Sequence, residues 1–353
     1  MLTWLMLSMG LVLLIVGAEL LVRGAARLAA SFGVPALVIG LTVVAFGTSA
    51  PELAVSVKSA WSGQTELAIA NVVGSNIFNV LFILGLAALV SPLVVSRQLI
   101  RQDVPIMILV SAIAAAMAWN GMLAPWEAGL LVVGLVVYTA FLFIQGRKGG
   151  ERADDGAPMP SVPVWRNLLL VVVGLALLVL GARWLVGSAV SIASSLGVSE
   201  AVIGVTIVAA GTSLPEVMTS VMATLRGQRD IAIGNVVGSN VFNVLCVLGL
   251  SGLVSPEPVV AGSQLAGLDI PVMVGVAVLC LPLFFTGATL SRFEGALFLG
   301  LYVSYVWYTV ALTLGASYLP MMEAGLAYGL IPLVVIVVVG LLVRDLVQRR
   351  SVS

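Results

Sequence analysis

Long apolar runs recur along the whole chain of 353 residues, and they constrain the fold more than any other feature. Runs of about 18 or more apolar residues are long enough to cross a bilayer as α-helices. Hydrophobic residues make up 61% of the chain and charged residues only 9%, whereas a soluble domain is about half apolar and a quarter charged. A membrane β-barrel would instead show short segments of alternating polarity. The sequence therefore predicts an all-α polytopic membrane protein.

Eleven membrane-spanning helices are predicted. They cover about 2–22, 35–58, 68–91, 104–119, 125–145, 167–186, 198–224, 231–254, 266–286, 293–314 and 324–343. Of the 16 lysines and arginines, only Lys58 and Arg183 then fall on the same side as the N-terminus. Because cytoplasmic segments carry the excess of basic residues, we expect an external N-terminus, a cytoplasmic C-terminus and a location in the cytoplasmic membrane.

A polar motif of ten residues occurs twice in these apolar surroundings. Asn71–Val80 reads NVVGSNIFNV and Asn235–Val244 reads NVVGSNVFNV, so nine of ten positions match at an offset of 164 residues. The segments GLTVVAFGTSAPELAVS from Gly40 and GVTIVAAGTSLPEVMTS from Gly204 align at the same offset. The repeat covers about five spans, and since five is odd, the second copy must enter the membrane from the opposite side. The pattern predicts an inverted-topology repeat of five plus five transmembrane helices, an architecture of many secondary transporters.

The repeat divides the chain into four segments. We expect a first five-helix repeat at 1–145 with its motif at about 40–85, and an inverted second repeat at 167–314 with its motif at about 204–249. Between them, 146–166 is a polar stretch with both charge signs and three prolines, which is typical of a flexible connector and is expected in the cytoplasm. The last segment, 315–353, is expected to form an extra C-terminal helix with a basic tail.

Two glutamates lie at matching positions inside apolar spans. Glu52 and Glu216 follow the helix-breaking prolines Pro51 and Pro215 in the motifs GTSAPE and GTSLPE. A charge at the bilayer centre costs about 2.5–3.5 kcal/mol even on the lenient insertion scale, so a bound cation is the natural counter-charge and protonation is the alternative. The prolines free backbone carbonyls in the preceding turn. Carboxylates and carbonyls together form a hard oxygen cage, which suits Ca²⁺ and Na⁺.

Each decapeptide also places polar side chains on one helix face, at intervals of four residues. Four of them are predicted to contact the ion, namely Ser75, Asn79, Ser239 and Asn243. The other asparagines, Asn71, Asn76, Asn235 and Asn240, are expected to join helices by hydrogen bonds. Ser49 and Ser213 share a helix face with the glutamates three residues later.

Four further acidic residues are expected to serve helix ends. Asp103 and Asp269 precede Val-Pro and Ile-Pro, a position typical of helix N-caps. Glu127 and Glu294 lie at helix starts, where the helix dipole favours a negative charge.

With its two GTSxPE and NxxGSNxFN blocks in inverted halves, the chain resembles the sodium/calcium exchangers of the cation/calcium exchanger superfamily, most of all the compact prokaryotic branch. The resemblance covers about residues 10–313. It implies a core of helices 2–5 and 7–10, across which helices 1 and 6 slide to alternate access. It also implies that calcium is bound by Glu52 and Glu216 with backbone help from Thr48 and Thr212. The predicted sodium ligands are these glutamates with Ser49, Ser75, Asn79, Ser213, Ser239 and Asn243.

The function expected from these features is Ca²⁺/Na⁺ antiport that exports Ca²⁺ with the sodium gradient. Ca²⁺/H⁺ exchange through the same glutamates is the alternative, and a passive Ca²⁺ channel is less favoured. Many exchangers carry an aspartate at the end of one motif, where both copies here have asparagine, and two carboxylates match one Ca²⁺ or two Na⁺. We therefore expect nearly electroneutral exchange. The chain has no histidine, so we expect neither an enzyme nor a cofactor, and its zero net charge does not indicate nucleic-acid binding.

Overall fold

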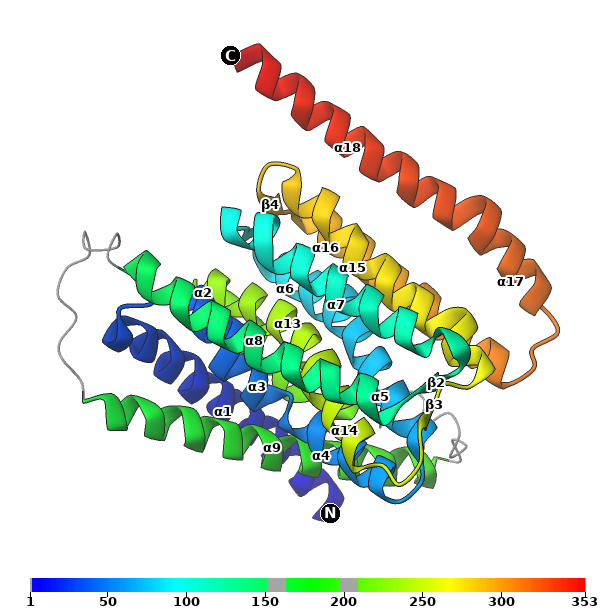
Figure 1. Cartoon of the computed structure of the whole chain (residues 1–353), viewed down its shortest axis with the longest axis horizontal. Helices are drawn as coiled ribbons and strands as arrows, with labels where there is room; N and C mark the ends of the chain where they lie inside the picture. The colour runs from blue at the N-terminus through cyan, green and yellow to red at the C-terminus, as the bar shows by residue number, and fades with distance from the viewer. Residues whose placement is uncertain (1, 151–162, 197–208, 353) are drawn as a thin grey trace.

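The computed structural model describes residues 2–150, 163–196 and 209–352, and helices dominate these residues (Figure 1). Nine of the described helices are long and apolar enough to span a membrane, and the bent pair Ala36–Thr48 and Ala50–Trp61 is a tenth candidate. The chain is therefore an all-α polytopic membrane protein, as predicted. The first part of the predicted span 198–224 and most of the predicted linker lie outside the described residues.

The first repeat contains the spans before the linker. Its elements are α1 (Leu2–Phe32), α2 (Ala36–Ile39), η1 (Gly40–Val44), α3 (Ala45–Thr48), α4 (Ala50–Trp61), α5 (Thr65–Phe78), η2 (Asn79–Leu84), α6 (Gly85–Val90), β1 (Leu93–Val94), η3 (Leu99–Asp103), α7 (Val104–Met117), η4 (Ala118–Asn120), β2 (Met122–Leu123) and α8 (Pro125–Gly150).

The second repeat follows the same order. Its described elements are α9 (Val164–Ser195), α11 (Ala209–Gly211), α12 (Leu214–Leu225), α13 (Arg229–Phe242), η6 (Asn243–Leu248), α14 (Gly249–Val254), β3 (Val259–Val260), η7 (Leu265–Asp269), α15 (Ile270–Phe285), β4 (Thr289–Leu290) and α16 (Arg292–Thr313). The extra helix then consists of α17 (Leu319–Gly325), η8 (Leu326–Leu330) and α18 (Ile331–Val352) and lies at one edge of the bundle (Figure 1).

Two short antiparallel ribbons connect the repeats. β1 pairs with β4, and β2 pairs with β3, so each ribbon takes one strand from each repeat. Loops can pair in this way only if they lie on the same side of the membrane. The eleven-span order meets this condition, because six spans separate β1 from β4 and four separate β2 from β3. The inverted repeat is thus visible in the loops as well as in the helices.

The helix that carries the first GTSxPE motif is broken at Ser49. This residue leaves the helical conformation, with φ −79° and ψ 4°, and the two halves of the helix meet at a bend of 46°. Ser213 has nearly the same conformation, with φ −88° and ψ 7°. Pro51 and Pro215 lie in the first turn after each break, where a proline costs little because the N–H that it lacks would have no helical partner. The sequence thus starts a new helix at each motif.

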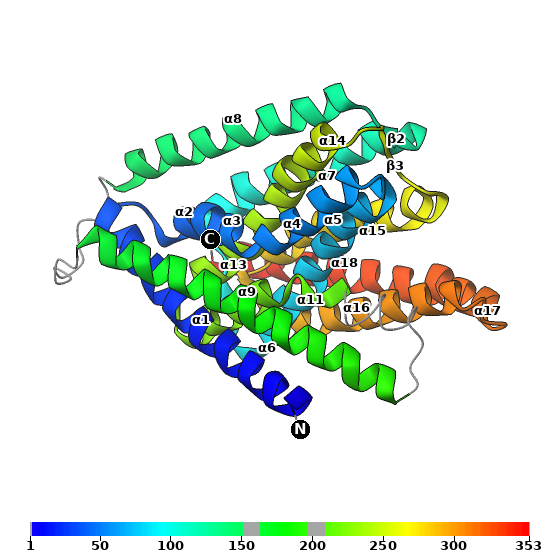
Figure 2. The ribbon, with the colours of Figure 1, turned by 90° about the horizontal axis from the view of Figure 1, so that it is seen from below.

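Helices α1 and α9 pack against each other through glycines. A Cβ atom added to Gly10 would lie 2.9 Å from the carbonyl oxygen of Gly181, and one added to Gly17 would lie 2.8 Å from that of Gly174. Only glycine permits backbones to approach so closely, as is common between membrane helices. The pair lies on the opposite side of α3, α4 and α13 from α8 (Figure 2).

Several helix ends differ from the predicted spans. The helices α1, α8, α9 and α18 run beyond the predicted 2–22, 125–145, 167–186 and 324–343, because hydropathy marks only the part of a helix that matches the hydrocarbon layer.

The predicted caps have mixed outcomes. Asp103 and Asp269 do not cap helices, since helical turns begin four residues before each of them and their side chains make no capping bond. Glu294 does serve its helix start, in a capping box with Ser291, and Glu127 accepts a hydrogen bond from the backbone of Ala124 at 2.8 Å.

Candidate functional site

The two glutamates of the GTSxPE motifs are buried in the middle of the bundle. Glu52 lies in the first turn of α4 and Glu216 in the first turn of α12, and their exposed fractions are 1% and 0%. Each glutamate follows a helix break, so its carboxylate lies near the positive N-terminal end of a helix. No lysine or arginine among the described residues forms an ion pair with either glutamate. The charge compensation that burial requires must therefore come from hydrogen bonds, a proton or a bound cation.

A crossed pair of hydrogen bonds links the two motifs. The Ser49 hydroxyl donates to Oε1 of Glu216 at 3.1 Å, and the Ser213 hydroxyl donates to Oε1 of Glu52 at 2.8 Å. Each serine therefore serves the glutamate of the other repeat. Ser49 and Ser213 are the N-cap residues of α4 and α12, so each break also positions a hydroxyl for the opposite carboxylate.

Four asparagines form a second crossed set of hydrogen bonds between the two copies of the decapeptide. The side-chain amide of Asn76 donates to the carbonyl of Asn240 at 3.1 Å, and that of Asn240 donates to the carbonyl of Asn76 at 3.4 Å. Asn79 donates to Oδ1 of Asn240 at 3.0 Å, and Asn243 donates to Oδ1 of Asn76 at 3.1 Å. In Asn79 and Asn243 the side-chain nitrogen is therefore the atom that forms the hydrogen bond, and the side-chain oxygen has no partner.

Six of the buried oxygens that have no hydrogen-bond partner among the described residues occupy matching positions in the two repeats. They form three pairs related by the repeat: Oε2 of Glu52 and Glu216, Oγ of Ser75 and Ser239, and Oδ1 of Asn79 and Asn243. Unpartnered buried polar atoms are rare and call for an explanation such as a bound ion. Carboxylate, hydroxyl and amide oxygens are the hard ligands that Ca²⁺ takes.

The packing of the helices brings these oxygens to one region. Helix α4 with Glu52 packs against α5 and η6, which carry Ser75 and Asn243. In the same way, α12 with Glu216 packs against α13 and η2, which carry Ser239 and Asn79. Asn79 and Asn243 each begin a π-helical segment. Such segments are frequent at functional sites, and here they follow both copies of the motif directly.

Thr48 and Thr212 lie directly before the breaks, but their side chains differ. The Thr48 hydroxyl donates to Oδ1 of Asn235 at 2.9 Å, whereas the Thr212 hydroxyl has no partner among the described residues. Pro51 and Pro215 lack the N–H that would bond to the carbonyls of Gly47 and Gly211. The carbonyl of Gly47 is nevertheless not free, because a backbone N–H at the end of α3 bonds to it, so the freed carbonyl expected at the first break is not found there.

The asparagines that were expected to join helices do so. Asn71 donates to the Ser56 hydroxyl at 2.9 Å, and Asn235 donates to the Ser220 hydroxyl at 3.0 Å. The prediction missed these two serines. They lie four residues after the glutamates and match across the repeat, so an alignment of the two halves could have identified them.

A further feature of the structure is an ion network at the edge of the bundle. Glu19 of α1 forms ion pairs with Arg23 one turn later and with Arg226 at the end of α12, the latter at 2.8 Å. Only Arg23 is close in sequence. Arg226 lies 207 residues away, and no spacing rule connects it with Glu19.

Comparisons with known proteins agree with this geometry. The family model described as sodium/calcium exchanger protein matches residues 2–144 and 166–311. The sodium/calcium exchanger MaX1 of Methanosarcina acetivorans is 33% identical over 348 residues, which cover 86% of this chain and 97% of that protein. The inner membrane protein YrbG of Escherichia coli is 37% identical over 263 residues, or 71% of this chain and 79% of that protein. Among solved structures, the sodium-calcium exchanger NCX_Mj superposes with a TM-score of 0.75 at 31% identity, covering 89% of this chain and 98% of that one.

Proposed function

Because the chain belongs to the sodium/calcium exchanger family, we propose that it is a Ca²⁺/Na⁺ antiporter that exports Ca²⁺ from the cytoplasm with the energy of the sodium gradient. Its homologues are transporters rather than enzymes. The coupling ion, the direction of transport and the binding residues are our inference.

One observation carries the proposal: three repeat-related pairs of buried oxygens lack partners, and all of them are hard ligands. Two carboxylates supply two negative charges, which equal the charge of one Ca²⁺ or of two Na⁺. Calcium would bind to Glu52 and Glu216 together with the backbone oxygens of Thr48 and Thr212. Sodium would bind to the same glutamates and to the hydroxyl and amide oxygens around them. The predicted ligands are Ser49, Ser75, Asn79, Ser213, Ser239 and Asn243.

In this proposal, the α1–α9 pair is the moving part for alternating access. The two helices contact each other closely through glycines, so they would move together. Leu175 of α9 packs on Gly47 directly before the first break, and Val186 packs on Gly211 directly before the second. A shift of the pair along the core would therefore change the surroundings of both breaks at once. Such rigid-body movement around a fixed midplane site is the usual mechanism of inverted-repeat transporters.

Proton coupling is the second candidate, and the glutamates provide its basis. Each carboxylate is buried and receives a serine hydrogen bond on only one oxygen, so either could carry a proton when no metal ion is bound. A passive channel is less favoured because inverted repeats with broken helices are typical of transporters. A channel would conduct Ca²⁺ without sodium on the opposite side.

Calcium uptake into proteoliposomes tests the coupling. Vesicles loaded with Na⁺ and diluted into sodium-free buffer should accumulate Ca²⁺, whereas vesicles loaded with K⁺ at the same pH should not. Uptake driven by an imposed pH gradient without Na⁺ would show proton coupling, and equal uptake in both loadings would show a channel. Protein-free vesicles and vesicles with the Glu52→Gln variant provide the background.

The orientation is also a proposal, and it rests on the distribution of lysines and arginines. Single cysteines at Ala153 and Ser351 should be labelled by a membrane-impermeant maleimide only from the cytoplasmic side. The native Cys246 and Cys280 are buried and should give a low background. Labelling of the two positions from opposite sides would show that the number of spans between them is wrong.

A further inference from the structure

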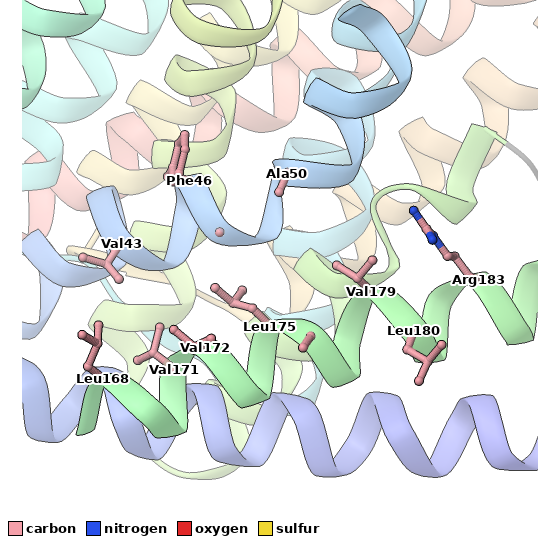
Figure 3. Close-up of a pocket in the computed structure, with 12 residues that line it drawn as sticks. Val43, Phe46, Ala50, Leu168, Val171, Val172, Leu175, Val179, Leu180 and Arg183 are labelled. Carbon is pink, nitrogen blue, oxygen red and sulfur yellow. The ribbon is translucent and has the colours of Figure 1, made fainter. Parts of the chain in front are cut away.

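An apolar cleft of about 750 Å³ lies between α9 and the broken helix α2–α4, which touch each other where Leu175 packs on Gly47. Val43, Phe46, Gly47 and Ala50 form one wall, and a single face of α9 from Leu168 to Arg183 forms the other (Figure 3). The lining residues of α9 recur every three or four positions, which is the spacing of one helix face. The cleft is therefore as long as about four turns of α9.

The lining of this cleft excludes ion passage. Arg183 is the only polar residue among those that line it. An ion there would meet no oxygen ligands to replace its water. Several lining side chains, such as Leu168, Val172 and Leu180, are at least 40% exposed, so the cleft opens towards the lipid that surrounds the bundle. Hydrocarbon is the chemistry that this surface fits.

Arg183 is the exception, and its charge has no ion-pair partner among the residues that the structure describes. It lies in the apolar run of α9 and forms no ion pair with any described acidic residue. Its repeat-related position in α1 is Glu19, which has two arginine partners. A cation on a membrane helix needs an anion or the headgroup layer close by. Among the described residues, the charge of Glu19 is thus compensated and that of Arg183 is not.

We propose that this cleft is a binding site for one anionic phospholipid, with an acyl chain between α9 and α3 and the phosphate on Arg183. The guanidinium group can bind a phosphate through two parallel hydrogen bonds. Leu168 and Arg183 are about 22 Å apart along the helix, and half of the hydrocarbon layer is about 15 Å thick. The cleft can therefore hold a whole acyl chain. The chain would lie beside Gly47, directly before the first helix break, whichever ions the protein transports.

Native mass spectrometry of the full-length protein tests the proposal. Protein in detergent is mixed with phosphatidylglycerol and phosphatidylcholine of identical acyl chains in equal amounts. The wild type should retain one phosphatidylglycerol with a preference of about tenfold, Arg183→Lys should keep most of the preference, and Arg183→Gln should abolish it. Arg166→Gln is the matched control, because Arg166 lies on the same helix over the Trp165 ring and outside the cleft.

Two further experiments distinguish binding of the lipid from binding of a free anion. Ala176→Trp fills the cleft without touching the charge and should lower retention of both lipids. Soluble glycerol phosphate should not compete, because the acyl chain contributes most of the buried surface. The proposal is wrong if Arg183→Gln or a folded Ala176→Trp retains phosphatidylglycerol like the wild type, or if glycerol phosphate displaces the lipid at equal concentration. The melting temperature of each variant in detergent shows whether it is folded.

Discussion

The two halves of the molecule are alike at the centre and unlike at the edge formed by α1 and α9. At the centre, both glutamates, both motif serines and both terminal asparagines have the same partners or the same unpartnered atoms across the repeat. At the edge, the glycines match, but Glu19 of α1 is replaced by Arg183 in α9. Among the described residues, Glu19 has an ion-pair partner in α12, Arg226, and Arg183 has none.

This difference indicates which parts of an inverted repeat must stay equivalent in both halves. In the proposed mechanism, an ion cage that opens to either side must offer similar ligands to both, so its atoms come in equivalent pairs. The relative energy of the two open states depends on contacts that form in one state and not in the other. Such contacts can be asymmetric, and in the proposed mechanism the ion pair between Glu19 and Arg226 would be one of them.

The largest effect is expected from substitutions that break the symmetry at the centre. Glu52→Gln and Glu216→Gln each keep the shape of the side chain and remove one negative charge from the cage. Loss of one partner of a buried charge pair costs about 3–5 kcal/mol, so Ca²⁺ uptake at low concentration should fall by at least roughly 100-fold. Because the two positions are equivalent, both variants should lose transport to a similar extent. The measurement is ⁴⁵Ca²⁺ uptake into sodium-loaded proteoliposomes.

The control for these variants is Glu257→Gln, a change in an exposed loop that should leave uptake unaltered. Normal exchange by one of the two buried variants would show that the halves are not equivalent at the centre.

The next largest effect is expected from the glycines at the edge, which match between α1 and α9. Gly17→Ala and Gly181→Ala each place a methyl group 2.8 Å from a carbonyl oxygen of the facing helix. Overpacking of this kind costs about 1–3 kcal/mol, so both variants should melt at lower temperature and transport more slowly. Gly187→Ala, on the same helix with nothing within 4 Å, should be at least as stable as the wild type. If all three variants behaved alike, the glycines would have no role in the contact between α1 and α9.

A smaller effect is expected from adding charge to one half of the centre. Asn243→Asp supplies a third carboxylate that could balance an additional Na⁺. The wild type should exchange ions with little dependence on voltage, and the variant should show a clear dependence. Sodium-driven Ca²⁺ flux with the voltage clamped by potassium and valinomycin measures this difference. A strong voltage dependence of the wild type would contradict the two-charge cage, and an equal response of Asn79→Asp would confirm that the two halves are interchangeable.

The smallest effect concerns the asymmetric ion pair. Glu19→Gln removes a partner from Arg226, whose side chain is 52% exposed, so the pair contributes about 0.2–1 kcal/mol. The ratio of half-saturating Ca²⁺ concentrations on the two sides should shift by up to about fivefold, while maximal binding stays the same. Arg226→Gln should give the same shift, and the double variant no more than either single one. Additive shifts would mean that the two residues act separately.

Much of this architecture could be predicted from the sequence, because its signals are local or repeated. Hydropathy located the spans, and the matched decapeptides revealed the inverted repeat. The glutamates after the prolines stood out because charge in an apolar run is costly. The partners of these groups were harder to find. That Ser49 serves Glu216, and Asn79 serves Asn240, follows from the packing of one repeat against the other, and neither copy of the motif contains that information.

Other predictions failed where local rules met the tertiary structure. Asp103 matched the pattern of an N-cap, but π-helical turns extend its helix backwards, and the side chain is buried beside Gln102 instead. The partnership of Glu19 with Arg226 depends on how α1 lies against α12. The first miss lies within one helix, whereas the second depends on the packing of two helices, which the periodicity of a single helix does not describe.

The reciprocal bonds of Asn76 and Asn240 have a consequence for the synthesis of the protein. Each half supplies hydrogen-bond partners for the other, so the first five spans leave the ribosome before the partners of Asn76 and Asn79 exist. These two amides lack their partners until α13 and η6 have been translated, more than 160 residues later. The early spans therefore need water, the insertion machinery or a chaperone near these groups during that interval. Assembly of the centre is in this sense a late, post-insertion step that joins two halves delivered in opposite orientations.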